Sequence, residues 1–165
     1  MATSPSDLIN NVASHFARIH LGGIPSLLND DGAFLSFICV LTATEALAGF
    51  LSPKLAGNGA RFKTFIQRYF PDPYPAQAED LWKFRNAIVH AFSPRPYSLT
   101  HHNSHIHLKQ HGGLTILNAE DFYAALVSAS KRYFDDLATD SALQQNLIKA
   151  TQKTGVIVVG PLTDI

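Results

Sequence analysis

Residues 33–51 read AFLSFICVLTATEALAGFL, the most apolar stretch of a 165-residue chain, and they carry one charged side chain, Glu45. Nineteen residues are long enough to cross a bilayer as a helix. A carboxylate within such a span costs about 2.5 to 3.5 kcal/mol on insertion scales, and no second hydrophobic segment of this length follows. The stretch therefore predicts a central buried helix, with no membrane as a partner.

Five further helices are predicted around this one, because apolar residues recur every three or four positions. A Gly-Gly pair ends the first of them, prolines follow the third and fourth helices of the chain, and Asn118 caps the fifth. The five predicted segments are residues 6–20, 62–70, 76–92, 118–137 and 141–153.

A different periodicity follows the fourth helix. Ile106 and Leu108 alternate with two histidines and a lysine, and a Gly-Gly pair separates them from the run LTIL at 114–117. This pattern predicts a β-hairpin, and the run VIVV at 156–159 is typical of a further strand. The expected fold class is mainly α, an up-and-down helical bundle of five to six helices with a small inserted β-hairpin. It forms one domain over residues 1–165, with the hairpin at about 97–117 and a C-terminal tail at about 154–165.

The charge balance excludes a protein that attracts nucleic acid through a large net positive charge. Thirteen basic residues face thirteen acidic ones, so any RNA contact must come from a local patch. A chain with 46% hydrophobic and 16% charged residues is not disordered. Cys39 is the only cysteine, and the first residues lack the basic and apolar regions of an export signal. We therefore expect a reduced protein without disulfides in the cytoplasm.

One charged residue falls inside the apolar face of the predicted fourth helix. At about 100° per residue, Arg85 lies in the same arc as the helix's apolar side chains. Burying a guanidinium without a partner costs several kcal/mol, so Arg85 must meet a carboxylate or line an opening. Glu45, the lone charge of the central helix, is the candidate partner. The apolar arc consists of Leu81, Phe84, Ile88, Ala91 and Phe92, with Trp82 and Val89 at its edge.

A polar stripe runs beside this arc and brings Asn86 and His90 one helical turn apart. The sequence Arg85-Asn86-Ala-Ile-Val-His90 resembles the Arg-x4-6-His signature of the HEPN (higher eukaryotes and prokaryotes nucleotide-binding) superfamily, in its frequent Arg-Asn-x3-His form. The resemblance covers about residues 30–140. It implies an antiparallel helical bundle and a metal-independent endoribonuclease that needs no cofactor and acts as a homodimer, with two motifs facing each other across a cleft. It also implies catalytic roles for Arg85, Asn86 and His90, and a supporting role for Glu45 as an acidic residue on an earlier helix.

The chemistry of these residue types agrees with that reaction. A histidine can take the proton of an RNA 2′-hydroxyl or give one to the leaving 5′-oxygen, and an arginine can stabilise the charge that develops on the phosphate. Asn86 could orient the histidine ring or bind the phosphate. Such cleavage of single-stranded RNA leaves a 2′,3′-cyclic phosphate and is consistent with a toxin or defence protein that has an antitoxin partner.

Structural interpretations of the same residues stay open. Arg85 and Glu45 can form a buried ion pair that fixes how two helices pack, and His90 can interact with the dipole of the helix end. The chain is then a non-catalytic HEPN-like interaction or nucleotide-binding module. Overproduction in cells distinguishes the two, because an active ribonuclease should slow growth.

The histidines of the predicted hairpin are a second cluster with possible chemistry. His105 and His107 should point to the same side of a strand, and such a pair can chelate zinc. The hairpin contains no carboxylate or cysteine to complete a site. We therefore expect these histidines to face solvent or line a groove, without a metal. The cluster consists of His101, His102, His105, His107 and His111.

Overall fold

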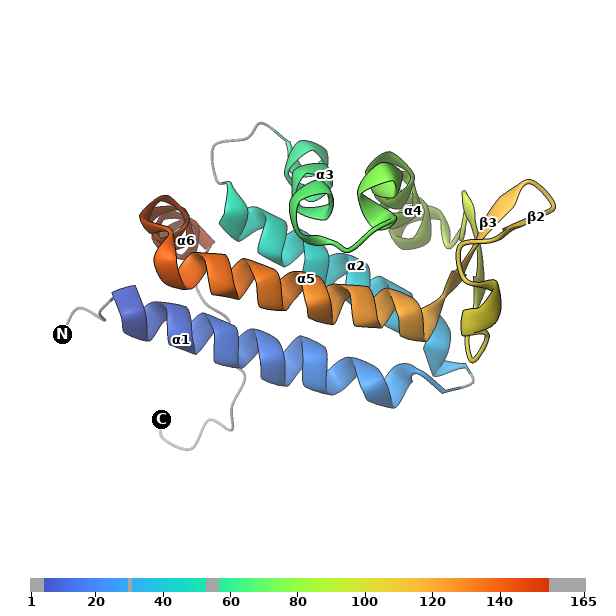
Figure 1. Cartoon of the computed structure of the whole chain (residues 1–165), viewed down its shortest axis with the longest axis horizontal. Coiled ribbons are helices and arrows are strands. Elements are labelled where there is room, and N and C mark those ends of the chain that lie inside the picture. The colour runs from blue at the N-terminus through green and yellow to red at the C-terminus, as the bar shows by residue number, and fades with distance from the viewer. Residues whose placement is uncertain (1–4, 30, 53–56, 155–165) are drawn as a thin grey trace.

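The computed structural model describes residues 5–29, 31–52 and 57–154 and shows a helical bundle with a small β-sheet at one end (Figure 1). Within these residues the α-helices are α1 Pro5–Phe16, α2 Gly32–Leu51, α3 Asn58–Tyr69, α4 Ala78–Ala91, α5 Ala119–Thr139 and α6 Ser141–Thr154. The strands are β1 Tyr97–Thr100, β2 Gln110–His111 and β3 Leu114–Asn118. The mainly α fold class with a small β insertion is confirmed, whereas the strand predicted at 156–159 lies outside the described residues.

The helices are arranged around α2. Helices α1, α2 and α5 run along the long axis of the molecule, whereas α3, α4 and α6 are seen nearly end-on and run across it (Figure 1). α2 packs against α3, α4, α5 and α6. The sheet lies at the end where α5 begins (Figure 1). The central helix predicted from residues 33–51 is therefore confirmed.

The burial of α2 accounts for its composition. Val40, Leu41 and Leu47 are almost fully buried, as a helix that is apolar all round requires. The buried hydroxyls of Ser36 and Thr44 donate to the carbonyl oxygens one turn earlier in the same helix, at 2.6 Å and 2.8 Å, and so need no other partner. Among the described residues, α2 is the one helix long and apolar enough to span a membrane, and half of its apolar window is buried inside the fold.

The limits of most predicted helices hold to within four residues. The first helix continues past Phe16 as a π-helical turn, Ala17–Leu21. The fourth begins as a 3₁₀ helix, Tyr74–Gln77, before α4. α5 begins directly after Asn118, as predicted.

The placement of Phe92 in the apolar arc of the fourth helix was wrong. α4 ends at Ala91, and Phe92 adopts a left-handed backbone conformation with φ of 50°. Its side chain therefore does not continue the apolar face of the helix. Its side chain is 76% exposed and its ring lies 4.7 Å from that of Phe34. Val89 and Ala91 are also exposed, whereas Leu81, Phe84 and Ile88 are buried as expected.

The β insertion is only partly the predicted hairpin. β2 and β3 are antiparallel across Gly112-Gly113, both of which have positive φ, as the Gly-Gly pair predicted. β1 pairs parallel with β3, however, and this gives a three-stranded sheet in the order β1-β3-β2.

The strand predicted through the alternating histidines is also wrong. The segment forms a 3₁₀ helix, Ser104–Ile106, followed by a turn in which Leu108 has a φ of 60°. Both ring nitrogens of His107 have hydrogen-bond partners here, the hydroxyl of Tyr74 and the backbone N–H of Asn118, so this side chain does not point to solvent as the outward side of a strand would place it.

Candidate functional site

Arg85, on the side of α4 that faces the core, forms an ion pair with Glu45 of α2. The Nε and Nη2 atoms of Arg85 each lie 2.7 Å from Oε2 of Glu45, so two N–H groups converge on one carboxylate oxygen. The two side chains are 19% and 21% exposed. The expected contact is present, and it joins two helices that are forty residues apart in the sequence. Two partly buried charges thereby neutralise each other.

Two neighbours on α4 hold the guanidinium from other sides. Arg85 lies over the indole ring of Trp82, with 5.6 Å between Cζ and the ring centroid. Its Nη1 donates to Oδ1 of Asn86 at 3.2 Å. Gly59 of α3 makes room for the indole, because a Cβ there would lie 2.8 Å from Trp82 Cε2. The contact of Trp82 with Arg85 was not predicted, and Gly59 is the residue of the sequence that could have indicated it, because a side chain there would collide with the indole.

The guanidinium keeps donors for a further ligand. An arginine side chain has five N–H groups, and three of them are directed to Glu45 and Asn86. Two N–H groups therefore remain for an anion such as a phosphate. Because the ring of Trp82 and the carboxylate of Glu45 fix the group, it can bind an anion with little further loss of side-chain freedom.

His90 lies apart from this cluster, at the solvent side of the last turn of α4. Its side chain is exposed, and it has no hydrogen bond or ion pair with any described residue. The helix places it one turn beyond Asn86. The structure thus brings Arg85, Asn86 and Glu45 together and leaves His90 at the exposed rim, where it is accessible to a ligand and also positioned to interact with the helix dipole.

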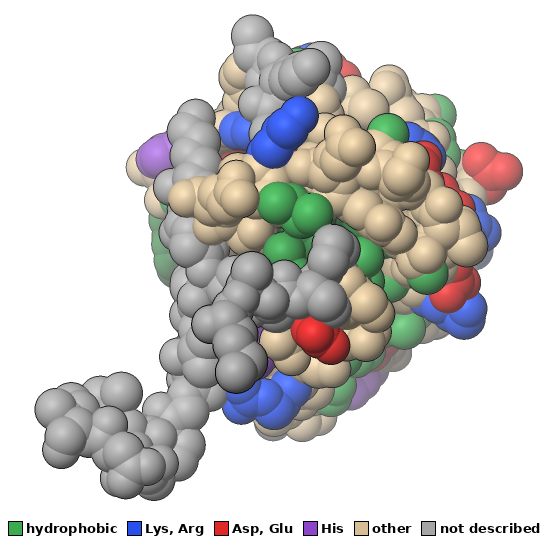
Figure 2. Space-filling view, turned by 90° about the vertical axis from the view of Figure 1, so that its left-hand side faces the viewer, with side chains coloured by type: hydrophobic (Ala, Val, Ile, Leu, Met, Phe, Trp, Pro, Cys, Tyr) green, Lys and Arg blue, Asp and Glu red, His purple; other side chains and the backbone are tan. Residues whose placement is uncertain are grey.

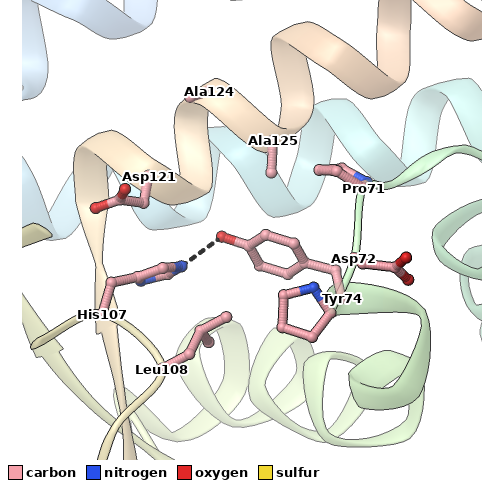
Figure 3. Close-up of a pocket in the computed structure, with 9 residues that line it drawn as sticks. Pro71, Asp72, Tyr74, His107, Leu108, Asp121, Ala124 and Ala125 are labelled. Carbon is pink, nitrogen blue, oxygen red and sulfur yellow. Dashed lines mark hydrogen bonds between the residues drawn. The ribbon is translucent and has the colours of Figure 1, made fainter.

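A cavity that the sequence did not predict lies between α5 and the β insertion. It has a volume of about 280 Å³, and its lining includes the polar residues Asp72, Tyr74, His107 and Asp121 (Figure 3). The backbone N–H of Asn118 donates to Nδ1 of His107 at 3.1 Å. The neutral ring must then carry its proton on Nε2, which donates to the hydroxyl oxygen of Tyr74 at 2.9 Å.

Burial sets the protonation behaviour of this cavity. It lowers the pKa of His107, although the Asp121 carboxylate acts in the opposite direction. It also raises the pKa of the Tyr74 phenol, so both groups are neutral near pH 7. His107 is therefore a fixed histidine that lines this cavity, whereas His105 is exposed. The prediction that the two point to the same side of a strand is wrong, because His105 lies in a 3₁₀ helix and the two residues do not share a strand.

On the face that Figure 2 shows, the described charged side chains are of both signs, as the zero net charge of the chain leads one to expect. At this end of the molecule, acidic and basic side chains alternate along one edge, and no continuous basic patch is visible (Figure 2). The described side chains seen on this face therefore form no broad basic surface for a polyanion.

Comparisons of the chain with protein-family models, with curated proteins and with solved structures find no match.

Proposed function

We propose that the protein is a HEPN-like endoribonuclease that cleaves single-stranded RNA without a metal ion. The observation that carries the proposal is the fixed guanidinium of Arg85, which keeps two N–H groups that Glu45 and Asn86 do not use, on a helix that also exposes His90 in its last turn. In the proposed reaction the 2′-oxygen of RNA attacks the adjacent phosphorus and the bond to the 5′-oxygen breaks. The products are a 2′,3′-cyclic phosphate and a free 5′-hydroxyl.

Each residue of the motif has a role in this proposal. His90 takes the proton of the 2′-hydroxyl, and a second proton reaches the leaving 5′-oxygen from the His90 of a second copy or from water. Arg85 stabilises the charge on the phosphate oxygens. Asn86 and Glu45 hold Arg85 in position. A homodimer that joins two motifs, a cytoplasmic location and an antitoxin partner belong to the same proposal.

Incubation of the purified protein with a mixed single-stranded RNA in EDTA tests the proposal. The expected result is cleavage that leaves 2′,3′-cyclic phosphates. His90→Ala should lower the rate at least about 100-fold, the usual contribution of a general base. His111→Ala is the matched control, because His111 is an exposed histidine outside the motif. Arg85→Lys should also lose most activity, because an ammonium lacks the planar fork of donors.

The assay needs a control for folding, because a variant that unfolds would also lose activity. Trp82 is the only tryptophan and lies against Arg85, so its fluorescence reports whether each variant keeps the site intact. Wild-type activity in a folded His90→Ala variant would falsify the catalytic assignment.

A non-catalytic binding module is the second candidate. The observation in its favour is that Glu45 already neutralises Arg85 and that the whole chain has no net charge. In that case intact protein leaves RNA uncut. Nucleotide or RNA then changes the fluorescence of Trp82, and His90→Ala does not abolish that change.

A further inference from the structure

We propose that His101, His102 and Glu120 form a binding site for a divalent transition-metal ion of the zinc class. One potential ligand atom from each of these side chains lies within 4.8 Å of the other two. The site is separate in the chain from the motif of α4, and the proposal does not depend on the ribonuclease proposal.

The topology of the β insertion explains why these residues meet. β1 pairs parallel with β3, and the last pair of the ladder is Thr100 with Asn118. The two histidines directly follow β1, and Glu120 is the second residue of α5, directly after β3. Parallel pairing places the carboxyl ends of both strands at one edge of the sheet, so the two segments that leave them lie side by side.

Hydrogen bonds orient the carboxylate before any ion binds. The backbone N–H of His102 donates to both oxygens of Glu120, at 3.1 Å and 3.0 Å, and Nδ2 of Asn118 donates to Oε2 at 2.9 Å. His102 Nδ1 lies 2.8 Å from Oε1. Outer partners of this kind fix the ligands of metal sites and raise their affinity. The backbone of His102 is held in a left-handed conformation, with φ of 55°, which keeps its ring beside the carboxylate.

His101 provides an independent observation that a partner belongs here. Its Nδ1 is buried and has no hydrogen-bond partner among the described residues. A buried polar atom without a partner ordinarily costs about 1 to 3 kcal/mol. The rings of His101 and His102 lie edge to face, with 4.7 Å between their centroids, so the two imidazoles are direct neighbours.

The donor set selects the class of ion. Two imidazoles and one carboxylate suit Zn²⁺, Co²⁺ or Ni²⁺, whereas Mg²⁺ and Ca²⁺ require a set of oxygen ligands. The side chain of His102 is 59% exposed and that of Glu120 is 29% exposed, so the ion has access from solvent and water can complete its coordination. A bound ion would join the end of β1 to the first turn of α5.

Titration of the intact chain with Co²⁺, followed through the visible absorption of the bound ion, tests the site, with Zn²⁺ as competitor. We expect one equivalent of Co²⁺ to bind and Zn²⁺ to displace it. His102→Ala and Glu120→Gln should each weaken binding at least about 100-fold. Glu120→Gln is the milder variant, because the amide keeps the size of the carboxylate and can still accept from Asn118. Mg²⁺ should not compete.

His105→Ala and His111→Ala are the matched controls, because both are exposed histidines of the same insertion. Both should bind Co²⁺ as the wild type does. Equal binding by the wild type and a folded Glu120→Gln variant overturns the proposal, as does loss of binding in the controls. The RNA assay in EDTA separates this proposal from the preceding one, because Glu120→Gln should leave metal-independent cleavage unchanged.

Discussion

The ion pair of Arg85 and Glu45 should contribute to the free energy of unfolding. Each is about one-fifth exposed, and the geometry directs two N–H groups of Arg85 to a single oxygen of Glu45. Removing one partner leaves the other charge partly buried without compensation. We expect Glu45→Gln and Arg85→Gln each to lower the free energy of unfolding by about 1 to 3 kcal/mol, less than for a fully buried pair because water reaches both groups.

A double-mutant cycle by urea denaturation measures this coupling. The variant with both substitutions should be more stable than the sum of the two single effects predicts, because it contains no unpaired charge. Lys131 and Asp135 form an exposed ion pair on α5 and serve as the control cycle, in which the coupling should be close to zero. Additive effects at Arg85 and Glu45 would show that the contact contributes nothing to stability.

Phe92 combines an unfavourable backbone with an exposed side chain. A non-glycine residue in the left-handed region costs about 1 to 2 kcal/mol, and glycine at this position after a helix removes that cost. Phe92→Gly and Phe92→Ala lose the same contact with Phe34, but only alanine keeps the strained conformation. We expect the glycine variant to be more stable than the alanine variant by about 1 kcal/mol, measured by thermal and urea unfolding. An alanine variant of equal or greater stability contradicts this explanation.

At the scale of elements, His107 joins the end of β3, through the backbone N–H of Asn118, to the 3₁₀ helix Tyr74–Gln77, through the hydroxyl of Tyr74. Because burial lowers its pKa, the unfolded chain takes up the proton at a higher pH than the folded protein does. His107 therefore contributes stability that is fully present above its ordinary pKa of 6.5 and is lost as the pH falls through the folded value. Protonation also puts an N–H on Nδ1 that opposes the N–H of Asn118.

His107→Asn tests this contribution, because the amide oxygen can accept from Asn118 but does not titrate. Between about pH 7 and about pH 5 the free energy of unfolding of the wild type should fall more steeply than that of the variant. Some slope should remain, since burial also lowers the pKa of His20. His111→Asn, at an exposed position, should keep the full slope. Identical slopes in the wild type and His107→Asn contradict the assignment.

The elements also show which contacts a sequence can reveal. The pairing of Arg85 with Glu45 was predictable, because each is the one charge on an otherwise apolar helix face and a buried charge needs a partner. The parallel pairing of β1 with β3 was not, because it joins segments separated by a helical turn and a hairpin and leaves no local pattern. The alternation of histidines with Ile106 and Leu108 resembled a strand, but the segment forms a 3₁₀ helix and a turn, and both ring nitrogens of His107 have hydrogen-bond partners that are distant from this pattern.

At the scale of the whole molecule, an exposed apolar surface borders the α4 motif. Phe92 is 76% exposed and its ring lies 4.7 Å from that of Phe34 on α2. Val89 of α4 is 43% exposed, and Leu35, next to Phe34 in the sequence, is 50% exposed. Val89 precedes His90 directly. A homodimer formed through this surface would bring the two copies of His90 toward each other, as the proposed ribonuclease requires.

Sedimentation of the wild type and Phe92→Asp tests this arrangement. A charge at the centre of an apolar contact costs about 2 kcal/mol or more, so the variant should dissociate at least about 30-fold more readily and lose RNA cleavage with it. Val127→Asp is the matched control, because Val127 is a similarly exposed apolar residue on α5. It should leave both the dimer and the activity intact. An active monomer would show that one copy of His90 is sufficient, and a dimer that survives Phe92→Asp would place the contact on another surface.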